Sequence, residues 1–183
     1  MMVANSDSEL DAVIVGAGFA GIHMLSSLLS FGYSAIVLEA GDEVGGTWNW
    51  NRYPGARCDT ESMFYSYGFS EALQQEWNWS ERYPKQPEIL SYAKHVVERF
   101  NLSNNIKFNT RVININWNKK NRKWGLETEE GERISANFCI MATGCLSSPN
   151  YPNIEGLDDF EGEIYHTGRW PNKKKSFKNK KNN

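Results

Sequence analysis

Residues 12–21 read Ala-Val-Ile-Val-Gly-Ala-Gly-Phe-Ala-Gly, and this stretch decides the fold of the 183-residue chain. Its first four residues form an apolar, β-branched run that stops at a glycine cluster, as a buried parallel strand does. A helical pattern of apolar residues follows, and Gly32 stands where a helix end favours glycine. A second apolar run over residues 35–38 then ends at Glu39. Strand, glycine loop, helix, strand and acid together predict an α/β fold with a dinucleotide-binding βαβ unit.

Each part of this unit has a physical task. Gly16 permits the tight turn, Gly18 leaves room for a pyrophosphate, and Gly21 lets the helix pack closely on the strand. The helix N-terminus offers unpaired N–H groups and a positive dipole to the phosphates. Glu39 can accept hydrogen bonds from ribose hydroxyls and disfavours a 2'-phosphate, so the site suits FAD or NAD over NADP. Glycines alone often serve only turns, and it is their context that indicates nucleotide binding.

The rest of the chain divides by its periodicity. Residues 41–84 show little periodicity but many glycines, aromatics and prolines, which indicates a long functional loop. A packing helix is expected over residues 87–100, with a proline in its first turn. Residues 106–140 alternate apolar and polar side chains, which predicts an antiparallel meander. A last apolar run over residues 138–142 precedes an irregular, proline-containing linker.

The charge is unevenly distributed. Seven of the 20 basic residues follow Glu163, which leaves residues 1–163 with 13 basic and 22 acidic residues and a net charge of −9. Nucleic acid recognition needs clustered Lys and Arg, so the acidic body argues against nucleic acid as a partner. We expect the short basic tail to be a solvated end.

The apolar runs and the cysteines indicate where in the cell the protein is located and whether it binds a metal. No apolar run approaches the roughly 18 residues that a membrane span needs, and the first ten residues lack the features of a signal peptide. Cys58, Cys139 and Cys145 make an odd count without a CxxC pair, which predicts reduced thiols rather than disulfides or a metal site. We therefore expect a cytoplasmic protein without a membrane span.

Two further motifs narrow the class of nucleotide-binding protein to which the chain can belong. Residues 45–48, Gly-Gly-Thr-Trp, follow the acid closely, although a glycine turn before a core tryptophan is a simpler interpretation of them. Residues 160–171 read Phe-Glu-Gly-Glu-Ile-Tyr-His-Thr-Gly-Arg-Trp-Pro and fit the pattern FxGxxxHxxxWP. Over about residues 10–181 the chain therefore resembles the Baeyer-Villiger monooxygenases, whose fingerprint this is. The related flavin-containing monooxygenases share a similar pattern but usually lack the final Trp-Pro.

This resemblance implies a Rossmann-like FAD-binding domain of the two-dinucleotide-binding-domain flavoprotein type, with the antiparallel β-meander as an insertion. We expect this domain, incomplete, over residues 1–145, and an interdomain linker with the fingerprint and the basic tail over residues 146–183. Family members are much longer, and this chain stops where their NADPH-binding glycine motif should begin. A truncated product, for example through a frameshift, is the expected explanation, and an evolved basic terminus is the alternative.

The resemblance also implies which residues contact FAD. Val112 would give a main-chain contact near the adenine, and Asp59 would lie beside the flavin and pair with an active-site arginine. From the residues alone, Asp59 could equally pair with Arg52 or Arg57, and Tyr65 could be core packing. The expected cofactor-binding set is Gly16, Gly18, Phe19, Ala20, Gly21, Glu39, Gly46, Thr47, Trp48, Asp59, Tyr65, Val112, Thr143 and Gly144.

In the implied reaction, NADPH reduces FAD, and dioxygen then supplies an oxygen atom that is inserted into a small ketone to give an ester or lactone. The cofactor carries the chemistry, while the protein excludes water and polarises the ketone. Asp59 and His166 are the expected catalytic residues, with His166 in a hinge that couples NADPH binding to the flavin site. Two alternatives stay open: a stand-alone FAD-binding or interaction module, and a flavin-containing monooxygenase that oxidises N or S atoms.

Overall fold

The computed structural model describes residues 10–171. Their elements, in chain order, are β1 (Leu10–Val15), α1 (Phe19–Ser30), β2 (Ala35–Leu38), α2 (Thr47–Trp50), α3 (Glu71–Glu76), α4 (Gln86–Arg99), the 3-10 turn η1 (Ser103–Asn105), β3 (Ile106–Lys107), β4 (Val112–Asn118), β5 (Lys123–Thr128), β6 (Arg133–Met141) and the 3-10 turn η2 (Thr167–Arg169).

The strands form one six-stranded sheet in the order β3-β2-β1-β6-β5-β4. β3, β2, β1 and β6 are parallel neighbours, whereas β6, β5 and β4 run antiparallel. β6 belongs to both parts, because Ala136 pairs with Leu10 of β1 on one side and with Trp124 of β5 on the other. The meander is therefore continuous with the parallel sheet.

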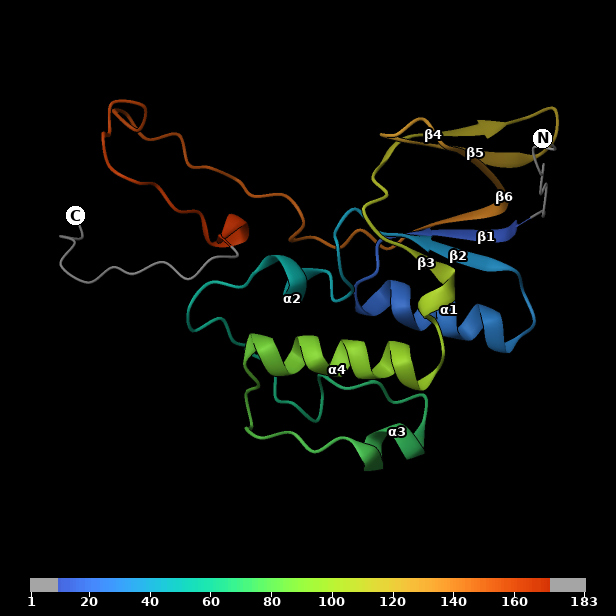
Figure 1. Ribbon diagram of the computed structural model, residues 1–183, viewed down its shortest axis with the longest axis horizontal. Coiled ribbons are helices and arrows are strands. Elements are labelled where there is room, and N and C mark those ends of the chain that lie inside the picture. The colour runs from blue at the N-terminus through green and yellow to red at the C-terminus, as the bar shows by residue number, and fades with distance from the viewer. Residues whose placement is uncertain (1–9, 172–183) are drawn as a thin grey trace, which may run out of the picture.

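Two cores lie on opposite faces of β1. Ala12 and Ile14 point toward α1 and α4, where they pack in one cluster with Ile22 and Val96. Val13 packs on the other face in a second cluster with side chains of β5 and β6. Figure 1 shows the same layers, with α1 and α4 on one side of β1 and β2, and β4 and β5 on the other. A strand covered on both faces needs apolar residues at every position, which explains the continuous apolar run that identified it.

The sequence-based expectations for the βαβ unit are confirmed. α1 ends at Ser30, just before the glycine expected at the helix end, Gly32, and β2 occupies residues 35–38 as expected. α4 begins at Gln86 with Pro87 in its first turn. This proline fits because the first N–H groups of a helix have no intrahelical partner.

Two expectations were wrong in detail. Ile106 and Lys107 do not open the antiparallel meander: they form β3, which pairs in parallel with Val37 and Leu38 of β2. A two-residue strand is too short for periodicity to separate it from its neighbours. The long loop over residues 41–84 also contains two short helices, α2 and α3. These helices are shorter than the window over which helical periodicity is detected.

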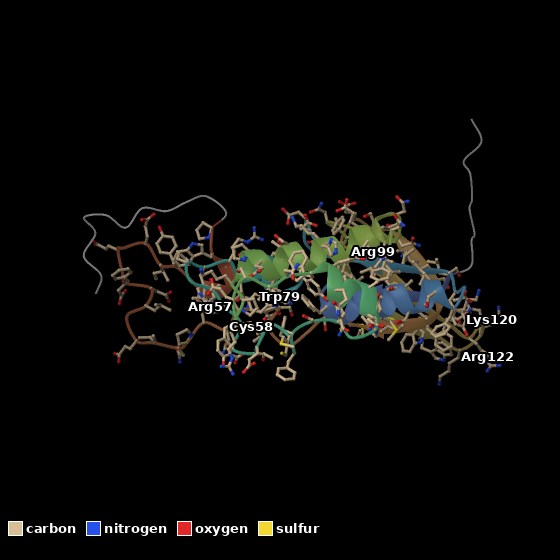
Figure 2. All side chains as sticks on the ribbon, turned by 90° about the horizontal axis from the view of Figure 1, so that it is seen from below. Arg57, Cys58, Trp79, Arg99, Lys120 and Arg122 are labelled. Atoms are coloured by element: carbon tan, nitrogen blue, oxygen red, sulfur yellow. The ribbon has the colours of Figure 1, made fainter. Side chains whose placement is uncertain are left out.

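The tip of the meander lies far from the loop that follows α2. Figure 2 shows Lys120 and Arg122, at the tip between β4 and β5, at one end of the molecule, and Arg57 and Cys58 toward the other.

Cys58, Cys139 and Cys145 are all free. Within residues 10–171, none of the helices combines the length and the apolar character that crossing a bilayer requires.

Candidate functional site

A cleft of about 390 Å³ opens at the carboxyl ends of the parallel strands. Val15 of β1, Leu38 of β2 and Met141 of β6 all line it. β2 and β6 lie on opposite sides of β1, so the chain leaves β1 in one direction and returns on the other side. In open α/β sheets, ligands bind in the crevice at such a switch point.

Most residues of the expected cofactor-binding set line this cleft. They are Gly16, Gly18, Phe19, Ala20, Glu39, Gly46, Thr47, Trp48, Tyr65, Val112, Thr143 and Gly144. Gly21 and Asp59 do not line it, and neither does His166. The structure thus brings together segments that lie up to 128 positions apart in the sequence.

Gly16 and Gly21 are required by the fold itself. Gly16 has a φ of +105°, and a Cβ on it would lie 2.6 Å from the carbonyl oxygen of Ala142. A Cβ on Gly21 would lie 1.9 Å from the carbonyl oxygen of Gly16. Both contacts are with backbone atoms, which cannot swing away as a flexible side chain can. Gly21 therefore belongs to the packing of α1 on the turn rather than to the cleft wall.

Gly18 differs from both because nothing in the protein requires it. Its backbone is extended, with φ −76° and ψ −173°, a conformation open to any residue. A Cβ there would meet only the Cα of Gly46, at an ordinary contact distance of 3.6 Å. Since Gly18 lines the cleft, the space that its missing side chain leaves open is space for a ligand.

Backbone N–H groups at the start of α1 provide an anion site beside Gly18. Gly18 is the N-cap, it offers no side-chain cap, and the first turn of α1 holds no acidic residue. Ile22 donates the first intrahelical hydrogen bond, to the carbonyl oxygen of Gly18 at 2.9 Å. The N–H groups of residues 19–21 therefore have no intrahelical acceptor. Together with the helix dipole they favour a phosphate at this point.

Glu39 lines the cleft directly after the end of β2, and its side chain is held in a fixed orientation. Its side chain is buried, with 4% of the residue exposed. Oε2 accepts a hydrogen bond from Ala17 N at 2.6 Å, and Oε1 accepts one from Gly41 N at 2.7 Å. Each carboxylate oxygen retains a second acceptor position. The carboxylate is thus oriented in advance and can still accept hydrogen bonds from two neighbouring hydroxyl groups of a ribose.

The second glycine motif packs directly against the first. Gly46 has a φ of +52°, and a Cβ on it would lie 2.8 Å from the Cα of Gly18. Gly45 N also donates a hydrogen bond to the carbonyl oxygen of Ala17 at 2.9 Å. The simpler interpretation of residues 45–48 as an isolated glycine turn therefore does not describe them, because this turn forms one wall of the cleft.

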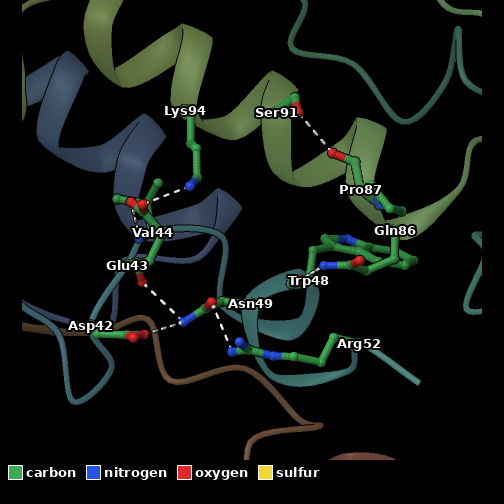
Figure 3. A network of polar contacts seen from close by, with 10 residues as sticks. All are labelled: Asp42, Glu43, Val44, Trp48, Asn49, Arg52, Gln86, Pro87, Ser91 and Lys94. Atoms are coloured by element: carbon green, nitrogen blue, oxygen red, sulfur yellow. Dashed lines mark hydrogen bonds and ion pairs between the residues drawn. The ribbon is translucent and has the colours of Figure 1, made fainter. Parts of the chain in front are cut away.

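A polar network anchors α2, which follows this turn. Asn49 donates to Asp42 and to the carbonyl oxygen of Glu43, and it accepts a hydrogen bond from Arg52 at 3.0 Å, as Figure 3 shows. Glu43 in turn forms a 2.7 Å ion pair with Lys94 of α4. These contacts hold the loop after β2 against α2 and α4. They fix the position of Trp48 on the cleft wall.

Trp48 and Tyr65 form a hydrogen-bonded aromatic pair in the cleft. The indole Nε1 of Trp48 donates to the hydroxyl oxygen of Tyr65 at 2.8 Å, and the rings meet edge to face with centroids 5.7 Å apart. Burial raises the pKa of the Tyr65 phenol, so this hydroxyl stays protonated. An indole N–H can only donate, hence Tyr65 is the acceptor here and keeps its own proton for another acceptor.

Replacing Tyr65 by phenylalanine is expected to destabilise the chain by about 1–2 kcal/mol, because the buried indole N–H of Trp48 loses its acceptor. Thermal unfolding of the unliganded chain measures this loss. Tyr33→Phe is the matched control, since Tyr33 is 50% exposed and its hydroxyl loss should leave the midpoint unchanged. Equal midpoints for both variants and the parent chain would contradict this account of the pair.

Sequence comparisons agree with this geometry. Residues 13–180 match the family model of the pyridine nucleotide-disulphide oxidoreductases. The chain belongs to this family. The chain is 41% identical over 165 residues to a Baeyer-Villiger monooxygenase of Pseudooceanicola batsensis, covering 90% of this chain and 30% of that protein. It is also 41% identical over 171 residues to the phenazine N-monooxygenase PhzNO1 of Lysobacter antibioticus, covering 93% and 32%.

A solved structure of a monooxygenase has the same fold as this chain. The cyclohexanone monooxygenase from Rhodococcus sp. Phi1 bound to NADP+ superposes with a TM-score of 0.85 at 41% identity, covering 92% of this chain and 32% of that one. The expected resemblance to Baeyer-Villiger monooxygenases and the expected Rossmann-like, FAD-binding type of fold are confirmed. The chain spans about 30% of the length of the curated relatives it matches.

Asp59 lies outside the cleft. It is exposed, and it forms no hydrogen bond or ion pair with the other residues of the described range. The alternative pairing with Arg52 or Arg57 is not formed either: Arg57 pairs with Glu81, and Arg52 donates to Asn49. Burial is the main cause of the raised pKa of Tyr65, and the negative charge of the nearby Asp59 adds to it.

His166 organises the fingerprint segment rather than the cleft. It caps η2, where its Nδ1 accepts a hydrogen bond from Gly168 N at 3.0 Å. Nδ1 is therefore unprotonated, and Nε2 carries the proton toward the carbonyl oxygen of Asn150 at 3.3 Å. The ring also packs on Tyr151, with centroids 4.6 Å apart. His166 thus joins the two ends of the loop between residues 150 and 166.

Trp50 and Arg169 are among the cleft residues that were not predicted from the sequence. Trp50 follows Trp48 by two positions, but the resemblance assigned only Trp48 to the cofactor. Arg169 occupies an unspecified position of the fingerprint pattern, so the motif itself gave no signal. Among residues 10–171, no three His, Cys, Asp or Glu side chains are grouped as a metal site would need.

Proposed function

We propose that the cleft binds FAD and that the chain forms the FAD-binding part of a monooxygenase. The open position beside Gly18 carries this proposal, because it lies next to the free N–H groups of α1 and serves no purpose in the protein's own packing. The diphosphate of FAD fits there. Glu39 would hold the ribose hydroxyls, and the turn with Gly46 and Trp48 would lie toward the flavin.

The proposed reaction inserts one oxygen atom of O2 into a small ketone, with NADPH as the reductant, to give an ester or lactone. Bound FAD supplies the redox chemistry. The residues of this chain bind and orient it: Glu39 accepts hydrogen bonds, Tyr65 offers its hydroxyl proton, and the aromatic wall around Trp48 excludes water. Asp59 and His166 keep their proposed roles beside the flavin and in the hinge. A cytoplasmic location is part of the proposal, in keeping with the free cysteines.

N-oxidation is a second candidate, favoured by the 41% identity to a phenazine N-monooxygenase. The Trp-Pro that ends the fingerprint at Pro171 supports the ketone reaction instead, because flavin-containing monooxygenases that oxidise nitrogen usually lack it. The two candidates share the same FAD cleft and differ in the reaction that the rest of the protein supports.

Domain exchange tests the proposal. Residues 10–171 replace the matched segment in the cyclohexanone monooxygenase and, separately, in the phenazine N-monooxygenase. The flavin content of each purified chimera is read from its absorbance, followed by substrate-dependent NADPH oxidation and product analysis. We expect flavin-loaded chimeras and lactone from cyclohexanone. N-oxide formation without lactone formation would favour the second candidate, and folded chimeras without flavin would contradict the proposal.

A further inference from the structure

Arg169 brings a positive charge to the cleft from the far end of the described chain. It is the last residue of η2, and it lines the cleft together with Trp50 of α2. Its guanidinium carbon lies over the Trp50 ring, 5.5 Å from the ring centroid. Figure 1 shows the same neighbourhood, with the red turn of η2 beside α2. This cation–π contact holds the guanidinium against one wall of the site.

The turn that carries Arg169 is held in place from both sides. His166 caps it through Gly168, and Nε2 of the same ring binds the carbonyl oxygen of Asn150. Tyr165 and Trp170, on either side of the turn, pack with ring centroids 5.5 Å apart. Arg169 is therefore presented by a structured turn and not by a free loop.

Arg169 also lacks the partner that most arginines of this chain have. Within residues 10–171 it forms no ion pair, and its Nη1 donates a hydrogen bond to the neighbouring carbonyl oxygen of Gly168 at 3.2 Å. The arginines with a carboxylate partner pair with glutamates: Arg57 with Glu81, Arg82 with Glu61, Arg99 with Glu76, Arg111 with Glu129, and Arg133 with Glu127. Residues 1–163 carry a net charge of −9. Arg169, which follows them, therefore brings to the cleft a guanidinium with donors available for an anion.

We propose that Arg169 binds the diphosphate of the nucleotide and so determines the affinity of the cleft for phosphorylated ligands. The inference rests on the proposed FAD site. The glycine loop supplies only backbone N–H groups, and Arg111, the other arginine on the cleft wall, has Glu129 at 3.8 Å. A guanidinium stacked on an aromatic ring suits this task because it presents a planar set of donors that matches phosphate oxygens.

The test compares ligands with and without phosphate. Calorimetric titrations of the 183-residue chain with ADP and with adenosine are made for the parent chain and for Arg169→Gln, with FAD affinity followed by flavin fluorescence. We expect the dissociation constants for ADP and FAD to rise by about tenfold or more in Arg169→Gln, and the constant for adenosine to stay unchanged. Arg169→Lys should recover part of the loss, because it restores the charge without the planar donors.

Arg82→Gln is the matched control. Arg82 also stacks on an aromatic ring, at 5.6 Å from the centroid of Tyr83, but it does not line the cleft. Its removal should leave all three dissociation constants unchanged. Equal weakening of ADP and adenosine by Arg169→Gln would overturn the inference in favour of an uncharged covering role, and so would unchanged binding of ADP. A parent chain that binds neither FAD nor ADP would overturn the proposed function itself.

Discussion

The Gly21→Ala variant is expected to lose about 3 kcal/mol of stability in the absence of any ligand, which corresponds to a thermal midpoint lowered by roughly 6–12 °C. The reason is steric. The added Cβ would lie 1.9 Å from the carbonyl oxygen of Gly16 and 3.0 Å from its carbonyl carbon. These are backbone atoms of the turn between β1 and α1, so the helix itself must move away from the sheet. Thermal unfolding followed by circular dichroism measures the change.

Gly68→Ala is the control for the Gly21 substitution. A Cβ on Gly68 would find only the Nε2 atom of Gln74, at 3.9 Å. The same chemical change there should leave the midpoint close to that of the parent chain. If Gly21→Ala unfolds at the parent temperature, the close approach of α1 to the glycine turn does not exist as described.

The Gly18→Ala variant should behave in the opposite way. Its unliganded stability is expected to change by less than about 1 kcal/mol, since a small loss at the helix N-cap is offset by a stiffer unfolded chain. Its affinity for FAD, in contrast, should fall by about a hundredfold, equivalent to roughly 2.7 kcal/mol. The Cβ has room within the protein but occupies the position where the diphosphate approaches the N–H groups of α1.

Flavin fluorescence and thermal unfolding, measured on the same Gly18→Ala sample, separate the two effects. A normal midpoint with weak FAD binding is the expected pair of results. A normal midpoint with unchanged affinity would mean that the nucleotide does not pass over Gly18. The two glycine variants together therefore separate the glycine that the fold needs from the glycine that the ligand needs.

The sequence predicted the parts of the fold whose residues act locally. Gly16 and Glu39 directly follow β1 and β2, as the sequence predicted. The prediction succeeded because strand, glycine turn and helix follow one another closely, and strands and helices differ in the spacing of their apolar residues. The same holds for Pro87, which belongs to the first turn of a helix for reasons of hydrogen bonding alone. These features depend on neighbours within a few positions.

Features that depend on residues far apart in the chain could not be predicted from the sequence in the same way. Ala136 of β6 pairs with β1 on one side and with β5 on the other, and this depends on which strands meet in space. The alternation of apolar and polar residues around Ala136 is compatible with either strand as a neighbour, so it could not predict both pairings. Trp50 and Arg169 lie 119 positions apart in sequence, and only the folded chain shows that they stack. Asp59 is the reverse case: the family resemblance assigned it to the flavin site, but it does not line the cleft that the described residues form.

A titration of the 183-residue chain with FAD tests most directly whether the cleft at the ends of β1, β2 and β6 binds FAD. Quenching of flavin fluorescence is followed together with the thermal midpoint. We expect saturable quenching at one FAD per chain and a midpoint that rises with the FAD concentration. A folded chain, shown by a cooperative unfolding transition, that neither quenches the flavin nor gains stability from it would contradict the proposed FAD site.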